Sequence, residues 1–420
     1  MKRKTLVYLC LITLLTTVVT AQQNPISRGP LRAAASGDGE WAQFNFDPAH
    51  DGYNPFETIL SPSTVGNVVL KWSGATSEGF PQGPPAVADG VLYVGAENTD
   101  LQQYAVYALN ADSGDFIWKS ATAGPPFGSP AVAFGLVYVV AGNVYAFDAN
   151  TGALVWQSQD SNCQYSPTLV NGTVYVVCDS NVVYALNAET GTPFWQYSTK
   201  GRINASPSVD NGMLYVNSGD GNLYALNADT GVVNWQRQLG ASLAPPTTLS
   251  GYAGGQAVAN GVLYLGVRNH FYALNASTGA SMWTDGLMLG PYAPGLTPAV
   301  ANGIVYVPAP EYGFVYALDA GTGTTLWKYQ AYNGGAVASP VIANGVVYVP
   351  SVTGAFGEGV YTIAAIDAST GEPLWQHTSG GIPNFGRSPT PAVVNGMIYC
   401  SLAESGVTGV GAFGLPEQQR

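Results

Sequence analysis

A twelve-residue phrase, YALNADTGVVNW at 224–235, recurs through most of this 420-residue chain. Related copies occupy 107–118, 145–156, 184–195, 272–283, 316–327 and 364–375, and an eighth tryptophan, Trp72, stands alone in NVVLKW. Successive tryptophans of this series are 38–48 residues apart. Self-similarity at such a period is typical of repeat architectures in which each repeat is one supersecondary unit. The phrase therefore constrains the fold more than any other feature.

A second phrase alternates with the first and occurs eight times between residues 84 and 400, for example SPSVDNGMLYV at 206–216. Two short apolar runs joined by Asn-Gly or Asp-Gly are the strongest local hairpin signal, because both central residues must take positive φ. The D/N-A-x-T-G stretch of the first phrase predicts a second hairpin. Each repeat thus carries four strands, as a propeller blade does.

The residues that stay constant between copies of the phrase are those that favour a tight turn. We expect Asn227 to accept a hydrogen bond from the backbone two residues on, Thr230 to add a hydroxyl for the same purpose, and Gly231 to take the left-handed conformation. Trp235, on the outermost strand, is expected to pack against the next blade and to set the angle between them. The same structural role is predicted for Trp72, Trp118, Trp156, Trp195, Trp283, Trp327 and Trp375.

The ends of the chain predict how the ring closes. The segment GVTGVGAFGLP (406–416) supplies an eighth strand of the YAL type without a tryptophan strand after it. The strand around Trp72 is therefore expected to complete the blade that begins at Thr390, which leaves no open sheet edge between the first and last blades. The predicted fold is all-β, an eight-bladed β-propeller of four-stranded blades spanning 62–416.

The N-terminus has the features of a signal peptide. Lys2, Arg3 and Lys4 precede an apolar stretch from Leu6 to Val19, and small residues then lead to a predicted cut near Ala21. The apolar stretch is shorter than the roughly 20 residues of a spanning helix, and a short membrane anchor is the alternative. We expect residues 1–21 to be removed and the product to be exported, soluble, and periplasmic or extracellular. Residues 22–61 are expected to be a linker and a segment packing on the propeller, and 417–420 a tail.

The net charge and the cysteines of the chain limit the classes of function that it can have. The chain carries 14 Lys and Arg against 26 Asp and Glu, a net charge of −12. Acidic surfaces repel phosphate backbones and anionic lipids, so we expect no nucleic-acid partner and no membrane insertion, and a monomer. Cys163 and Cys178 flank a strand–turn–strand centred on Asn171-Gly172, and export permits the disulfide that we expect there. Cys400 is then left as a buried, small apolar residue.

The phrases SPVIANGVVYV (339–349) and YALDAGTGTTLW (316–327) resemble the repeats of the pyrroloquinoline-quinone (PQQ)-like propellers. The resemblance covers about residues 62–416, and 40–72 is similar to the leading segment of quinoprotein alcohol dehydrogenases. It implies the fold but not the activity, because the superfamily includes dehydrogenases and non-catalytic propellers such as the outer-membrane barrel assembly lipoprotein. The dehydrogenases typically hold PQQ between a Trp and a disulfide of adjacent cysteines. This chain has no such pair and no C-x-x-C-H.

Candidate site residues lie in the irregular loops, which the fold gathers around one mouth of the central channel. Arg202, Arg268 and Arg387 are the residues that could bind a polycarboxylate such as PQQ through forked hydrogen bonds. Glu311, Glu358 and Glu404 occupy corresponding places in consecutive blades and could hold calcium. The alternative is that all six are solvated loop charges. His50, His270 and His377 show no metal-ligand spacing.

Two functions follow from these patterns. The short loops and the missing cysteine pair favour an exported, non-catalytic propeller that binds a protein or glycan partner through loops at one face of the channel, with no cofactor. The repeat and the leading segment favour the alternative, a PQQ- and calcium-dependent dehydrogenase that oxidises an alcohol or a sugar.

Overall fold

The computed structural model describes residues 40–76, 80–98, 101–239, 253–267, 270–285, 296–331, 336–353, 359–382, 390–404 and 407–417. All of them belong to one compact unit, Arg32–Arg420. The predicted signal peptide, 1–21, lies outside the described residues. In the described part of the chain, no helix is long and apolar enough to cross a membrane.

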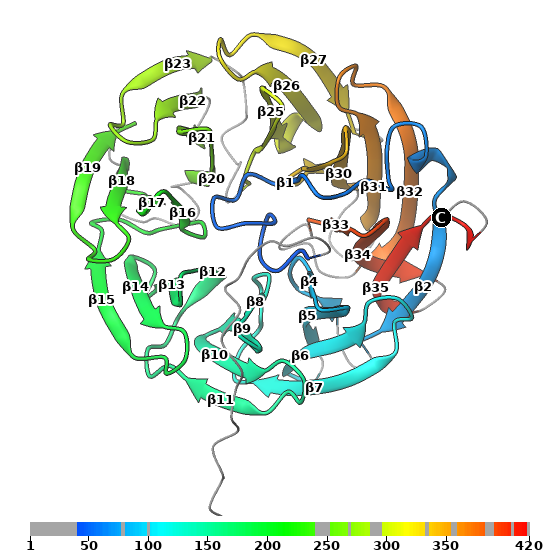
Figure 1. The fold of residues 1–420 in the computed structure, drawn as a ribbon, viewed down its shortest axis with the longest axis horizontal. Helices are drawn as coiled ribbons and strands as arrows, with labels where there is room; N and C mark the ends of the chain where they lie inside the picture. The colour runs from blue at the N-terminus through cyan, green and yellow to red at the C-terminus, as the bar shows by residue number, and fades with distance from the viewer. Residues whose placement is uncertain are drawn as a thin grey trace, which may run out of the picture. The chain divides into compact units, whose positions relative to one another are not determined.

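The described chain forms eight antiparallel sheets around a common axis, each with its first strand nearest the axis (Figure 1). The first blade contains β4 (Ala86–Ala88), β5 (Val91–Asn98), β6 (Gln103–Asn110) and β7 (Phe116–Thr122), and the second contains β8 (Ala131–Ala133), β9 (Leu136–Ala141), β10 (Asn143–Asp148) and β11 (Leu154–Gln157). The third blade contains β12 (Gln164–Val170), β13 (Thr173–Cys178), β14 (Val182–Asn187) and β15 (Pro193–Ser198). The fourth contains β16 (Ser208–Asp210), β17 (Met213–Asn217), β18 (Asn222–Asn227) and β19 (Val233–Gln238). A short β3 (Phe80–Pro81) also pairs with β5.

The fifth blade contains β20 (Ala253–Ala259), β21 (Val262–Val267), β22 (His270–Asn275) and β23 (Ser281–Asp285). The sixth contains β24 (Ala299–Ala301), β25 (Ile304–Ala309), β26 (Phe314–Asp319) and β27 (Thr325–Gln330). The seventh contains β29 (Val341–Ala343), β30 (Val346–Thr353), β31 (Gly359–Asp367) and β32 (Pro373–Ile382). Beside the seventh blade, β28 (Ala336–Val337) pairs with β30, and β1 (Tyr53–Asn54) pairs with β29. Two 3-10 turns, η1 (Val65–Asn67) and η2 (Pro310–Tyr312), complete the elements.

The eighth blade joins the two ends of the propeller. It contains β33 (Ala392–Val394), β34 (Met397–Glu404), β35 (Val407–Gly414) and, as its outer strand, β2 (Val69–Ala75). The register runs from Val69 opposite Gly414 to Ala75 opposite Gly409. The prediction of an eight-bladed propeller closed by the strand around Trp72 is confirmed.

The two turn types take the backbone that their residues favour. In the fourth blade, Asn211 and Gly212 have φ of 47° and 73°, the positive pair that a two-residue hairpin needs. In the second turn, Asn227 Oδ1 accepts hydrogen bonds from the amides of Asp229 (3.1 Å) and Thr230 (2.9 Å) and from the Thr230 hydroxyl (2.9 Å). The Ala228 amide donates to the Gly212 carbonyl (2.9 Å), so both turns lie at one end of the disc. We call this the NG end and the opposite end the loop end.

The tryptophans connect neighbouring blades. Trp235 Nε1 donates to the carbonyl of Ala276 in the next blade (3.0 Å), and the Tyr215 hydroxyl donates to the same oxygen (3.1 Å). Equivalent tryptophan bonds in other blades join Trp72 to Ala111, Trp118 to Ala149, Trp156 to Ala188, Trp195 to Ala228, Trp283 to Ala320 and Trp327 to Ala368. Trp375 packs edge-on against Phe413 of the last blade. The blade interface is thus both apolar and hydrogen-bonded.

Candidate functional site

The axis of the propeller at the NG end is occupied by the chain itself. Residues 41–57, which we call the strap, cross the middle of the ring ahead of the first blade (Figure 1). The strap contacts each blade at the same position, the inner-strand residue two places before the first residue of the NG turn or its equivalent. The bonds are Trp41 with Val87, Ala42 with Val132, Gln43 with Leu169, Pro48 with Val209, Ala49 with Val258, Asp51 with Val300, Gly52 with Ile342 and Asn54 with Val393.

These contacts satisfy backbone groups that would otherwise face the channel. The first strand of a blade has a neighbour on one side only, so its free edge presents N–H and C=O groups toward the axis. Strap carbonyls accept from the amides of Val132, Val209 and Val300, each at 2.7 Å. At the end of the strap, the carboxylate of Glu57 accepts from the Gly396 amide of the last blade (2.9 Å). The strap therefore closes this end of the channel and links all eight blades.

The middle of the strap is tightly wound. Asn45, Phe46 and His50 have φ of 49°, 77° and 59°, a left-handed conformation that is costly for a residue as large as phenylalanine. The ring of Phe46 is held edge-on against Trp41, with centroids 5.4 Å apart. The Asn45 carbonyl accepts from the amides of Asp47 and Gly52. Packing and hydrogen bonds thus maintain a strained turn at the axis.

This turn brings carboxyl groups together. Burial raises the pKa of Asp47 to about 6 despite hydrogen bonds from neighbouring backbone amides. Burial, and then the charge of Asp47, raise the pKa of Asp51 to about 8. Asp210, the last residue of β16, adds to both effects. The group holds protons at pH values where ordinary carboxyls are ionised, which is the property of a proton donor or acceptor near neutral pH.

His50 lies in the same turn and is fully buried. Burial lowers its pKa to about 3, so the ring is neutral in the folded protein. Its Nε2 lies 3.2 Å from the hydroxyl of Thr168 on β12, and that hydroxyl donates to the Pro207 carbonyl. The histidine is therefore a positioning group between the third and fourth blades, and it supplies no positive charge to the carboxyls.

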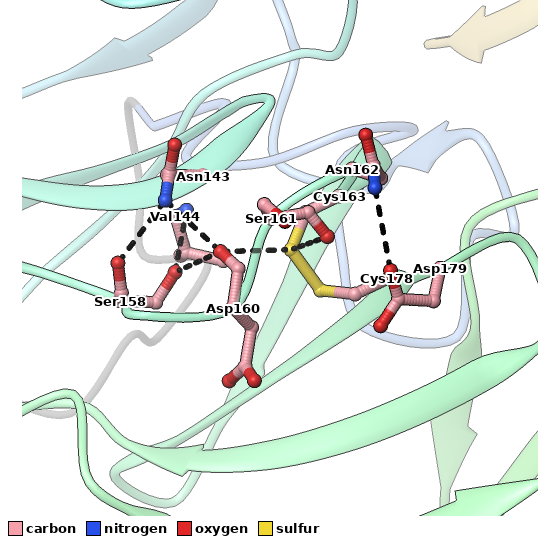
Figure 2. Close-up of a disulfide and its surroundings, with 9 residues drawn as sticks. All are labelled: Asn143, Val144, Ser158, Asp160, Ser161, Asn162, Cys163, Cys178 and Asp179. Carbon is pink, nitrogen blue, oxygen red and sulfur yellow. Dashed lines mark hydrogen bonds between the residues drawn. A yellow bond between two sulfur atoms is a disulfide. The ribbon is translucent and has the colours of Figure 1, made fainter.

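At the loop end, the structure joins Cys163 and Cys178 by a disulfide (Figure 2). The register of β12 on β13 pairs Gln164 with Val177, which places the two cysteines directly opposite each other. Beside the disulfide, Asn162 Nδ2 donates to Asp179 Oδ1 (3.4 Å), and both residues have positive φ (Figure 2). Cys400, the remaining cysteine within the described part of the chain, is buried and forms no disulfide.

Two further sets of polar side chains lie at this mouth of the channel. Arg202 donates to Gln164 Oε1 (3.0 Å) and links the start of the fourth blade to the third. In the adjacent β17–β18 turn, Asp220 accepts from the Tyr224 hydroxyl (2.7 Å) and from the Lys200 amide (3.1 Å). The loop end thus presents exposed amide, guanidinium and carboxylate groups.

The structure describes some of the predicted site residues and not others. Arg202 is exposed at the loop end, where it contacts Gln164. Arg268, Arg387 and Glu358 lie outside the described residues. Glu311 is in η2 and Glu404 ends β34, but their side chains are likewise outside the described part. Among the described residues, no group of three or more His, Cys, Asp or Glu is placed to hold a metal ion.

Sequence reasoning missed the groups at the axis. Asp47, His50 and Asp51 lie in NFDPAHDGYNP, a segment outside the repeats. One feature of the sequence could have indicated them. Three titratable residues occur within five positions, in a segment that the repeat pattern does not explain. Burial is the main cause of their pKa shifts, and Asp210 of the fourth blade adds to the shifts of Asp47 and Asp51.

Eight four-stranded sheets with these turns and tryptophan contacts define a PQQ-like repeat propeller. A family model described as outer membrane protein assembly factor BamB matches residues 34–167, 141–291 and 267–412. These matches span most of the sequence, and the chain belongs to this family of PQQ-like propellers.

Individual relatives differ in activity. Tetrathionate hydrolase of Acidithiobacillus ferrooxidans is 28% identical over 363 residues, covering 75% of this chain and 69% of its own length. The quinohemoprotein alcohol dehydrogenase of Pseudomonas putida HK5 superposes with a TM-score of 0.69 at 18% identity, covering 90% of this chain and 80% of that one. BamB from Moraxella catarrhalis gives 0.63 at 19% identity, covering 83% and 98%. The two structural likenesses establish the fold alone.

Proposed function

We propose that the chain is an exported binding propeller that receives a protein or glycan partner at the loop end of its channel. The observation that carries the proposal is the strap, which fills the axis at the NG end and ties all eight blades together. The disc is thereby made rigid, and the irregular, polar loops remain at the opposite end. Rigid elements that present varied loops are the usual basis of recognition by repeat folds.

The described loops offer chemistry suited to such a partner. Arg202 and Asn162 are exposed and supply directional hydrogen-bond donors. Asp179 lies beside Asn162 and supplies acceptors. The disulfide between Cys163 and Cys178 fixes the strand from which these loops emerge. Binding there requires no movement of the blades.

Site-specific photocrosslinking in the producing cell tests the proposal. A photoreactive residue replacing Ser161 at the loop end is expected to give a discrete adduct with a protein partner, and a glycan array read with the purified chain covers the second class. The matched control replaces Asp112, which is exposed in a turn at the NG end. Adducts of equal yield from both ends, or no adduct and no glycan signal, would contradict the proposal.

A second function, hydrolysis of tetrathionate or a related compound, is favoured by the relative of 28% identity. The carboxyl groups of Asp47 and Asp51 add support, because groups that titrate near neutral pH are suited to general acid–base catalysis. Loss of tetrathionate during incubation with the purified chain, abolished by Asp51→Asn, would replace the binding proposal with this one.

The PQQ-dependent dehydrogenase is the weaker alternative. The disulfide links residues 15 positions apart rather than adjacent cysteines, so it does not reproduce the cofactor sandwich of those enzymes. Of the three candidate arginines, the described residues include Arg202 alone, and its guanidinium contacts Gln164. These two observations favour the binding propeller over the cofactor-dependent enzyme. A titration with PQQ and calcium that produced a thermal shift would revive this alternative.

A further inference from the structure

The strap has acidic side chains at the point where its backbone closes the channel. The carbonyls of Pro48, Ala49 and Asp51 accept from the amides of Val209, Val258 and Val300 at 2.7, 3.0 and 2.7 Å. These three bonds fix the strap to the fourth, fifth and sixth blades. Asp47 precedes this stretch, and Asp51 ends it. Any repulsion between their carboxyl groups and the blades acts directly on the bonds that hold the strap.

Within the described part of the chain, no positively charged group is among those that shift the pKa of Asp47 and Asp51. Among the described residues, the titratable groups acting on Asp47 and Asp51 are each other and Asp210, which follows Val209 on β16. On the neighbouring strand β17, the Tyr215 phenol lies near Asp210 and is neutral. His50, in the same turn, is neutral because it is buried. When ionised, Asp47 and Asp51 would repel each other and Asp210, and the backbone amides that donate to Asp47 and Asp51 offset this repulsion only in part.

The backbone of the strap is already under strain at this place. Phe46 and His50 have φ of 77° and 59°. A segment held in such conformations persists only while its surroundings over-determine it. Asp47 contributes to this by accepting a hydrogen bond from the Asp51 amide (3.4 Å). Weakening the contacts therefore favours release of a strained segment rather than a small local adjustment.

We propose that the strap is a proton-dependent latch: it closes the NG end of the channel while Asp47 and Asp51, beside Asp210, hold a proton, and it loosens when Asp47 and Asp51 are both ionised. Release would open the channel through the disc and free the inner edges of the blades. This regulation is separate from recognition at the loop end.

The direction of the pH effect follows from the two states. The pKa of Asp51 is about 8 in the closed strap, and its ordinary value of 3.8 applies once the strap is released. The closed form therefore binds the extra proton, and raising the pH through this window favours release. Between about pH 6 and pH 8, one proton is lost per opening, which corresponds to roughly a tenfold change per pH unit. Above about pH 8 the effect is complete.

Amide hydrogen exchange on the full chain tests the latch. Protection of peptides containing Val209, Val258 and Val300, corrected for intrinsic exchange, is expected to fall by up to about a hundredfold in total between pH 6 and pH 9. Central-strand amides of β17 are expected to keep their protection, since their partners are within the blade. Constant protection of the three strap-bonded peptides across this range would overturn the proposal.

Two variants distinguish the effect of these carboxyl groups from a general loosening of the protein at alkaline pH. The double variant Asp51→Asn, Asp210→Asn keeps the size of both side chains and is expected to lose the pH dependence of protection. Glu189→Gln, an exposed acid in a turn at the same end of the disc, is expected to retain it. The same fall in the double variant as in the wild type contradicts the latch.

A measurement on the wild type covers the case in which the double variant does not fold. Chymotrypsin cleavage within the strap at Phe44 or Phe46 is expected to accelerate between pH 6 and pH 9 relative to an unfolded peptide of the same sequence. An unchanged relative rate would exclude release.

Discussion

The indole ring of Trp235 lies directly against Gly279, the turn glycine of the following blade. A Cβ atom placed on Gly279 would come within 2.7 Å of Trp235 Cε3. The same contact joins Trp195 to Gly231 and Trp283 to Gly323. The glycine of the T-G turn thus has two requirements, a positive φ and an empty face for the neighbouring tryptophan.

Gly279→Ala separates these two requirements when it is compared with Gly303→Ala. Both glycines have positive φ, 70° and 77°, but a Cβ on Gly303 would have no atom within 4 Å. The Gly303 variant should lose about 1 kcal/mol from backbone strain, and the Gly279 variant about 1 to 3 kcal/mol more from the clash. Denaturant unfolding measures both. Equal losses would show that the tryptophan contact adds nothing.

The carbonyl of Ala276 predicts a coupling between two aromatic residues. Trp235→Phe and Tyr215→Phe each leave that buried oxygen with one donor, whereas the double variant leaves it with none. The double loss of stability should exceed the sum of the single losses by about 1 kcal/mol, because an unpaired buried acceptor is costly. Pairing Trp235→Phe with Tyr264→Phe, whose hydroxyl donates to Ala320, is the control and should be additive.

The pH dependence of global stability should reflect the strap. Asp47 and Asp51 have folded pKa values of about 6 and 8, above the ordinary 3.8, so their contribution is fully present below about pH 4 and is lost as pH rises to about 8. His50 acts in the opposite direction below pH 6.5, because its folded pKa is about 3. We expect a decrease of about 3 kcal/mol between pH 5 and pH 8, allowing for solvent screening.

Asp51→Asn is expected to flatten this decrease, and Glu189→Gln is the matched exposed control. Thermal unfolding at intervals of one pH unit provides the measurement. A wild-type profile that rises from pH 5 to pH 8 would contradict the assignment of Asp51.

The disulfide should stabilise the third blade. Cys163 and Cys178 close a loop with a sequence separation of 15. Replacing both by alanine should lower the free energy of unfolding by about 3 kcal/mol, the chain-entropy value for a loop of this length. Chemical denaturation with and without reductant measures the effect, and no change in the double variant upon reduction confirms its origin.

Much of the fold was predictable from local chemistry. Asn211-Gly212 and the Asn227–Gly231 turn specify hairpins through their own backbone preferences, so their repetition predicts the blades. Trp72 could be assigned to the last blade because the repeat count left one strand unmatched at each end of the chain.

The axis was not predictable in the same way. The strap has no repeat and no apolar periodicity, and its structure depends on acceptors that eight separate blades require. The pKa of Asp51 depends on burial beside Asp210, which lies far along the chain. Arg202 lies at the loop end in the structure, and its charge alone could not reveal its contact with Gln164.

The pairing of β2 with β35 has a consequence for how the molecule is made. Val69 pairs with Gly414, so the last blade contains both the first and the last long strands of the described propeller. The ring cannot close until β35 has been synthesised, and the strap cannot complete its contacts from Val87 to Val393 until β33 has been made. The ring therefore stays open for almost the whole synthesis of the propeller, and its blades are joined into one closed structure in a single late step.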